Sequence, residues 1–567
     1  MSDNPEAVRL KDRGNALYCQ GEYEQALDLY TQALELLDDS NPILLTNRAA
    51  CYNMLKKFNE GMEDAYLATH YDPNYYKAWW RLAEAQDALC YYYLAAENWR
   101  RAMQALPSSP TASQRSHGEY FMLSMKASTE KDDVASREKM RKALGIPPGS
   151  APWERAEAVR ARRDVAKDSS TSCVGSLLHA STQFNKGLEI LAREDFHRQD
   201  TNFAVDPCHV PDGALLCLSE ALLTDERAAL LHDKHYVDRV KRLITYEVKK
   251  SGAPDPGRKF EEIISAIQQL QTEGGWDRVR PAIEAIVRSL VLRGDISVSL
   301  RVDFETGYKI LNKAVKIITW GRAEWAHTTE PEHGSIIAGA FLANLQRAAL
   351  IAYRGVLIRT RRRNSQYSVA ELLERSAALI DFARGLSTSG PKTSGPGPDV
   401  DGLESMTPGV AAAWIVYSQA QAHSLKAWCL SENVQAGGTT EERKALRRAV
   451  IDSYLTAASL YPEDEEWHGV ELHNVLINHF LLRSPLRDTV PVMERIRRVV
   501  PRIMEIWEYS NVMGGSLKED LEKVETFAAG VQEAMNEGRR GYGDLDVVVP
   551  KLVSTPYSEV QGYSIVL

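Results

Sequence analysis

The first part of the chain repeats one pattern of small and apolar residues three times. The alanines at the same place in each copy, Ala33, Ala68 and Ala102, lie 35 and 34 residues apart. Within each copy the apolar residues recur at helical spacing, so each copy predicts two helices joined by a turn. One hairpin cannot bury its apolar face alone, and repeats of this period therefore stack on one another. The sequence predicts an all-α superhelix whose first helices line a concave groove.

Small residues fall where the two helices of each hairpin must approach most closely. The pairs at these positions are Gly14 with Ala26, Ala49 with Gly61, and Ala83 with Ala95. The pattern resembles the tetratricopeptide repeat, which implies three repeats at about residues 7–40, 42–75 and 76–109, in a domain that spans residues 1–110. After Pro110, a helix over about residues 114–128 is expected to cap the stack, because the last repeat needs a polar outer face.

Five polar residues lie on the first helices of the three copies, at positions that face the predicted groove. They are Lys11, Asn15, Asn47, Lys77 and Arg81. Residues four apart on a helix share a face, so each pair with that spacing forms one polar patch. The set resembles the dicarboxylate clamp of heat-shock co-chaperones, whose repeat domains grip the C-terminal tails of cytosolic chaperones. The resemblance implies that Lys11, Asn15 and Asn47 hold a terminal carboxylate, while Lys77 and Arg81 reach the acidic side chains beside it.

The chemistry of these side chains suits a carboxylate ligand in its own right. Charge-assisted hydrogen bonds from Lys and Arg to a carboxylate are about twice as strong as neutral ones, and Arg can bind bidentately. Residues 1–110 carry 10 Lys and Arg but 16 Asp and Glu, so a cationic groove is a local exception. Tyr18, Trp80 and Glu84 are predicted to line the same groove. The two aromatic residues could hold an apolar residue of the ligand, and Glu84 could weaken an acidic tail or select a particular one.

Composition limits what the chain can be. A net charge of −9 argues against general nucleic-acid binding. The most apolar run, residues 336–343, is too short to span a membrane, and the N-terminus lacks a signal-peptide pattern. The seven cysteines include no Cys-x-x-Cys pair, so they predict neither a disulfide framework nor a zinc site. We expect a soluble cytoplasmic protein, with the nucleus as the alternative location.

Beyond the repeats the chain keeps a helical pattern but loses its regular period. We expect a capping helix and charged linker over 111–170, helical regions over 171–385 and 410–545, a flexible loop rich in Gly, Pro and Ser over 386–409, and an unplaced tail over 546–567. The apolar residues Val450, Tyr454, Ala457 and Leu460 resemble the second helix of the first repeat. The second half is therefore predicted to be a divergent helical repeat, with an unrelated helical bundle as the alternative.

The sequence contains no recognisable catalytic or metal-binding motif. Residues 385–393 approach a phosphate-binding loop, but Pro391 separates Gly390 from Lys392 and has no N–H to offer a phosphate. His232 and His235 lie near each other without a pattern of further ligands. We therefore predict no enzyme, no cofactor and no metal.

Three functions are consistent with these residues. The favoured one is an adaptor whose clamp binds the acidic tail of a chaperone, while the C-terminal half binds a second, unidentified protein. The alternatives are a general scaffold for internal peptide segments and an enzyme with a helical catalytic domain in residues 171–545. A scaffold would not need a free C-terminus on its ligand. An enzyme would bring acidic and His residues together in a pocket of the second half.

Overall fold

The computed structural model describes residues 4–37, 41–143, 146–162, 172–192, 213–229, 236–300, 303–327, 335–360, 366–388, 408–436, 438–510, 512, 517–539 and 541. Over these residues the predicted all-α class is confirmed, because every regular element is a helix. The chain divides into two compact units: the N-terminal unit spans Met1–Met140, and the C-terminal unit holds most of the remainder.

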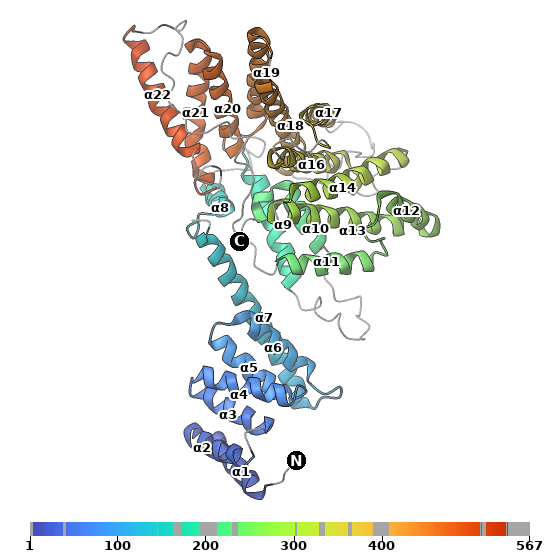
Figure 1. Cartoon of the computed structure of the whole chain (residues 1–567), viewed down its shortest axis with the longest axis vertical. Coiled ribbons are helices and arrows are strands. Elements are labelled where there is room, and N and C mark those ends of the chain that lie inside the picture. The colour runs from blue at the N-terminus through green and yellow to red at the C-terminus, as the bar shows by residue number, and fades with distance from the viewer. Residues whose placement is uncertain are drawn as a thin grey trace. The chain divides into compact units, whose positions relative to one another are not determined.

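The N-terminal unit consists of three helical hairpins and a long further helix (Figure 1). The hairpin helices are α1 (Pro5–Gln20), α2 (Tyr23–Glu35), α3 (Pro42–Met54), α4 (Phe58–Tyr71), α5 (Tyr76–Ala88) and α6 (Tyr92–Gln104). Asn4 and Asn41 cap α1 and α3 with their side-chain oxygens, and each is followed by a proline that suits the first helical position. Gly21 ends α1 with a positive φ of 83°, a conformation that glycine adopts at little cost.

The small residues bring the helices of each hairpin into close contact. A Cβ atom on Gly14 would lie 2.7 Å from Tyr30 Cε1, and one on Gly61 would lie 2.4 Å from Asn53 Oδ1. Tyr30 is fully buried against this gap. These distances leave no room for a larger residue at Gly14 or Gly61. The helices therefore pack closely at these two positions, as their small residues indicated.

The predicted capping helix is longer than expected. The structure has α7 at Ala112–Ala143, where the sequence pattern indicated residues 114–128. Residues 129–143 lack an apolar stripe, which suggested a linker, but they contain strong helix formers and no Gly or Pro. Phe121 and Met125 of α7 are buried and pack against Trp99 of the third hairpin. The helix therefore packs against the third hairpin and then continues beyond it.

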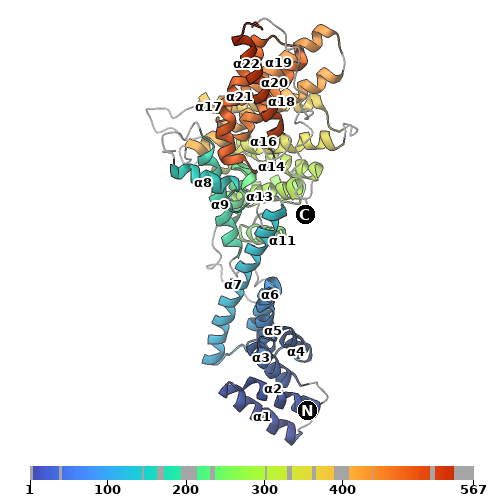
Figure 2. The same ribbon diagram turned by 90° about the vertical axis from the view of Figure 1, so that its left-hand side faces the viewer.

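The C-terminal unit is a larger set of helices, most of which pack against their neighbours in sequence. They are α8 (Pro152–Arg162), α9 (Val174–Ala192), α10 (Ala214–Thr224), η4 (Glu226–Ala229), α11 (Tyr236–Lys250), α12 (Phe260–Gly274), α13 (Trp276–Asp295), η5 (Ile296–Leu300), α14 (Phe304–Glu324), η6 (Ser335–Ile337), α16 (Gly339–Arg359), α17 (Val369–Thr388), α18 (Pro408–Ala436), α19 (Thr440–Leu460), α20 (Glu466–Leu482), α21 (Leu486–Trp507) and α22 (Lys518–Asn536). The helices α20, α21 and α22 lie side by side, as Figures 1 and 2 both show. Val450, Tyr454 and Ala457, singled out by their spacing, are buried on α19.

A buried polar cluster joins distant segments of the C-terminal unit. The Arg227 guanidinium lies 2.7 Å from carboxylate oxygens of Asp225, Glu465 and Glu466, and its Cζ lies 3.9 Å from the ring centroid of Trp507. We call Arg227 and these three carboxylates the Arg227 cluster. Burial raises the pKa of Glu465 to about 7, although the charge of Arg227 acts to lower it. Loss of the guanidinium would leave buried carboxylates without their cation.

Some sequence predictions fall on residues that the structure does not describe. Most of the predicted loop (389–407), the predicted tail (546–567), His232 and His235 lie outside the described residues. None of the described helices holds the long, apolar and nearly uncharged stretch that a membrane span requires. Among the described cysteines, Cys19 and Cys90 are exposed.

Candidate peptide-binding site

Two of the predicted site residues, Asn15 on α1 and Asn47 on α3, are in direct contact. Asn47 Nδ2 donates to Asn15 Oδ1 at 3.0 Å, and the Tyr30 hydroxyl donates to the same oxygen at 2.8 Å. Because Oδ1 of Asn15 accepts both bonds, the orientation of its amide is fixed and Nδ2 remains as its donor end. The first two hairpins thus hold an ordered pair of amides.

The two lysines at the candidate site differ in exposure, since Lys77 is exposed whereas Lys11 is half-buried like Asn15 and Asn47. The Lys11 side chain is 32% exposed, and its Nζ lies 3.7 Å from Oδ1 of the adjacent Asp12. Lys77 lies near the start of α5. Both ammonium groups can therefore reach an incoming anion without leaving a buried partner unpaired.

Three residues of α5 contact one another: Trp80, Arg81 and Glu84. Arg81 Nη1 lies 2.8 Å from Glu84 Oε2, and the Trp80 indole N–H donates to Glu84 Oε1 at 2.7 Å. The Arg81 Cζ also lies 4.5 Å from the Trp80 ring centroid. All three were predicted to lie at the groove, but their mutual bonding was not. We call these three residues the α5 triad.

The helix α7 adds a histidine to this region that sequence reasoning missed. The His117 ring centroid lies 4.9 Å from that of Trp80, and its Nδ1 lies 3.3 Å from the Tyr76 hydroxyl. Burial lowers the pKa of His117, and the positive charges of Lys77 and Arg81 lower it further. The only sequence signal was the placement of His117 on the predicted capping helix, which did not indicate which face it occupies.

Tyr18 on α1 is influenced by charges on the α5 triad. Burial raises the pKa of its hydroxyl, the charge of Arg81 acts in the opposite direction, and Glu84 raises it. Its ring packs edge-to-face on Tyr23, with centroids 5.3 Å apart. The predicted groove residues of α1 and α5 therefore share one electrostatic environment.

Comparison with known proteins shows what this part of the chain is similar to. It is 45% identical over 101 residues to the heat-shock protein cognate co-chaperone sgt12 of Aspergillus fumigatus, which is 18% of this chain and 29% of the relative. It is 33% identical over 108 residues to the heat shock protein STI1 of Saccharomyces cerevisiae, which is 19% of this chain and 18% of the relative. The three hairpins are tetratricopeptide repeats. The chain spans less than a third of the length of each of these relatives.

Solved structures of tetratricopeptide domains also match. The Sgt2 domain from Aspergillus fumigatus is 36% identical with a TM-score of 0.20, and the match covers 22% of this chain and 83% of that one. The first such domain of Spaghetti (RPAP3), solved with the HSP90 peptide SRMEEVD, is 33% identical with a TM-score of 0.20, covering 21% of this chain and 92% of that one. No protein-family model matches the chain.

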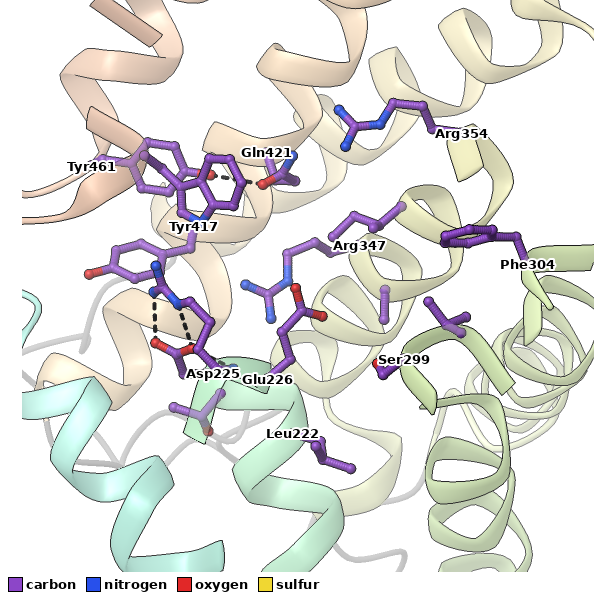
Figure 3. Close-up of a pocket in the computed structure, with 16 residues that line it drawn as sticks. Leu222, Asp225, Glu226, Ser299, Phe304, Arg347, Arg354, Tyr417, Gln421 and Tyr461 are labelled. Atoms are coloured by element: carbon purple, nitrogen blue, oxygen red, sulfur yellow. Dashed lines mark hydrogen bonds and ion pairs between the residues drawn. The ribbon is translucent and has the colours of Figure 1, made fainter. Parts of the chain in front are cut away.

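A pocket in the C-terminal unit, lined by both polar and apolar side chains, bears on the enzyme alternative. Figure 3 shows Arg347 and Glu226 pointing toward one another within it. Tyr461 donates to Gln421 at 3.1 Å, and Arg347 Nη2 donates to the Leu223 carbonyl at 2.6 Å. Arg227 is paired with carboxylates there, and no histidine is among the described residues that line the pocket. The described lining contains the acidic residues Asp225 and Glu226 and three arginines, and we assign the pocket no ligand.

Proposed function

We propose that this chain is an adaptor whose tetratricopeptide repeats bind the acidic C-terminal tail of a cytosolic heat-shock chaperone. The observation that carries the proposal is the set Lys11, Asn15, Asn47, Lys77 and Arg81 on the first helices of three consecutive repeats. The similarity of this part of the chain to a heat-shock cognate co-chaperone supports it.

The contacts within the repeats support a carboxylate ligand. The ordered pair Asn15–Asn47 presents amide N–H groups whose orientation is already set, so little side-chain entropy is lost when an anion binds. Lys11, which precedes the two asparagines in the sequence, and Lys77, which follows them, supply positive charge. A free chain terminus captured by such donors is a recurring mode of peptide recognition.

In this proposal the C-terminal unit has a role separate from that of the repeats. It carries its own two apolar cores, so it is a folded body and not a linker. We propose that it binds a second protein, which the repeats bring to the chaperone.

The first test measures binding of the full chain to a peptide ending in Glu-Glu-Val-Asp, with a free and with an amidated C-terminus. We expect micromolar affinity for the free tail and a loss of about tenfold or more on amidation, because one charge-assisted bond contributes about 1.5–3 kcal/mol. Lys77→Ala should lose affinity similarly, whereas exposed Lys57→Ala, in the α3–α4 turn, should not. Equal binding of both tails would show instead that the repeats take internal segments.

A second test uses the pH dependence of the same binding. A ligand carboxylate beside Lys77 and Arg81 would offset the charges that lower the pKa of His117, so its pKa would rise in the complex. The complex would then take up a proton, and affinity should increase as the pH falls through the pKa of His117 in the complex, by up to about tenfold for each unit of pKa difference.

Isothermal titration between about pH 7.5 and 5.5 measures this slope, and buffers of different ionisation enthalpy count the protons. His117→Asn should remove the slope while leaving affinity near pH 7.5 almost unchanged. A slope that persists in the variant would assign the proton to another group.

A further inference from the structure

A carboxylate already occupies the cationic end of the candidate clamp. Both oxygens of Glu84 are bonded, one to the Trp80 indole N–H at 2.7 Å and the other to Arg81 Nη1 at 2.8 Å. The Arg81 and Glu84 side chains are 22% and 26% exposed, so this is a partly desolvated pair and not a surface contact. The arginine that would receive an acidic side chain of the ligand is therefore bonded within the free protein.

The surroundings hold this pair in place. Arg81 lies over the Trp80 ring with its Cζ 4.5 Å from the centroid, and the same ring contacts His117 of α7 at 4.9 Å between centroids. The Arg81 backbone carbonyl also accepts from Asn53 Nδ2 at 3.0 Å, which ties α5 to α3. Because the three residues of the α5 triad lie within one turn or so of one helix, the helix places their side chains within reach of one another.

The other end of the candidate site differs. Asn15 Oδ1 accepts from both Asn47 Nδ2 and the Tyr30 hydroxyl. The nearest acidic neighbour of Lys11 is Asp12, which is 66% exposed and lies 3.7 Å away, so solvent screens that contact. A terminal carboxylate would meet donors there, whereas a side-chain carboxylate at Arg81 would meet Glu84.

We propose that Glu84 is an internal competitor for Arg81 that makes the clamp read the terminal carboxylate of a tail more than its acidic side chains. The inference rests on the proposed function and concerns its selectivity. Glu84 holds one edge of the Arg81 guanidinium, so an acidic side chain of the ligand binds Arg81 either by displacing Glu84 or beside it. In both cases the two carboxylates lie close to each other and repel. Tails that carry amides in place of acidic side chains are not subject to this competition.

The experiment compares two free-ended peptides on the full chain and on Glu84→Gln, an isosteric change that keeps an oxygen for the Trp80 N–H. One peptide ends in Glu-Glu-Val-Asp and the other in Gln-Gln-Val-Asn. The native chain should prefer the acidic tail by no more than about tenfold, the share that its contact with Lys77 supplies. Glu84→Gln should bind the acidic tail about tenfold more tightly, which corresponds to about 1.4 kcal/mol, and the amide tail about equally.

A double-mutant cycle assigns the effect to Arg81. In the Arg81→Gln background, Glu84→Gln should no longer change the affinity for the acidic tail, because the contested guanidinium is absent. Exposed Glu60→Gln on α4 is the matched control for loss of one negative charge and should change affinity by less than about twofold.

The outcomes separate this inference from the proposed function. If Glu84→Gln leaves the acidic-tail affinity unchanged while Lys77→Ala still removes binding, the inference is wrong and the proposed function stands. Tight binding by Glu84→Gln alone, with none by the native chain, supports the competition and overturns the chaperone tail as the native ligand. Absence of binding to every free-ended tail by both proteins overturns both.

Discussion

Replacing Arg227 by Ala should lower the free energy of unfolding of the C-terminal unit by about 3–5 kcal/mol. Its guanidinium is bonded to Asp225, Glu465 and Glu466, and all of these groups are buried. Removing one partner of a buried ion pair costs this much because it leaves charges without solvent or counter-ion. Urea unfolding followed by segment-resolved hydrogen exchange of α10, α20 and α21 measures the loss.

The same variant should be less impaired at pH 5 than at pH 8. Burial already raises the pKa values of Glu465 and Glu466, and loss of Arg227 removes the nearby charge that acts to lower them. Protonation then neutralises the stranded carboxylates at the lower pH. Exposed Arg160→Ala on α8, which breaks a surface pair with Glu157, should cost less than about 0.5 kcal/mol. A comparable loss in both variants would contradict the role of the Arg227 cluster.

Relative to the native chain, Glu471→Gln should make the C-terminal unit more stable at pH 8 than it does at pH 5. Glu471 is buried on α20 and accepts from Ser424 and Asn474. Burial raises its pKa to about 7, and the two hydrogen bonds only partly oppose this. A carboxyl whose pKa is higher in the folded state contributes stability at low pH and loses it as the pH rises through about 7. Glutamine resembles the protonated acid and does not titrate.

The difference between variant and native unfolding free energies should therefore rise by about 2–3 kcal/mol from pH 5 to pH 8, at about 1.4 kcal/mol per pH unit below pH 7. Burial lowers the pKa values of His423, His468 and His473 to about 4, so these groups act in the opposite direction on total stability. Taking the difference at each pH cancels them. Exposed Glu525→Gln on α22 is the control, and an equal pH profile for both variants would refute the assignment to Glu471.

The N-terminal fold could be read from the sequence because its contacts are local. Gly14 approaches Tyr30 within one hairpin, and such contacts repeat at a fixed period that the sequence displays. The C-terminal unit could be assigned only to the helical class, because its buried polar contacts join residues with no shared spacing. The contact of Arg227 with Glu465 spans 238 residues, and no periodic pattern marks it.

The candidate site was identified by residue type and helical position, but its internal bonding was not. The spacing of Lys77 and Arg81 indicates a shared face, and the same spacing rule places Glu84 one turn from Arg81. Whether such neighbours bond to each other or to a ligand depends on rotamers and on packing from another helix. Here the Trp80 ring contacts both Arg81 and His117 of α7, and its indole N–H donates to Glu84. The sequence did not show that α7 would supply this contact.

The long-range contacts of the C-terminal unit also constrain the order of events during synthesis. The Cys173 amide donates to Asp464, and the Trp507 indole donates to the Asp464 carbonyl, so segments made early are joined to segments made late. The repeats can fold as soon as α7 has left the ribosome, since their contacts are complete by then. The second unit can complete its long-range contacts only after residue 507 has emerged. A nascent chain of this protein therefore passes through a period in which its tetratricopeptide repeats can be native while the second unit is incomplete.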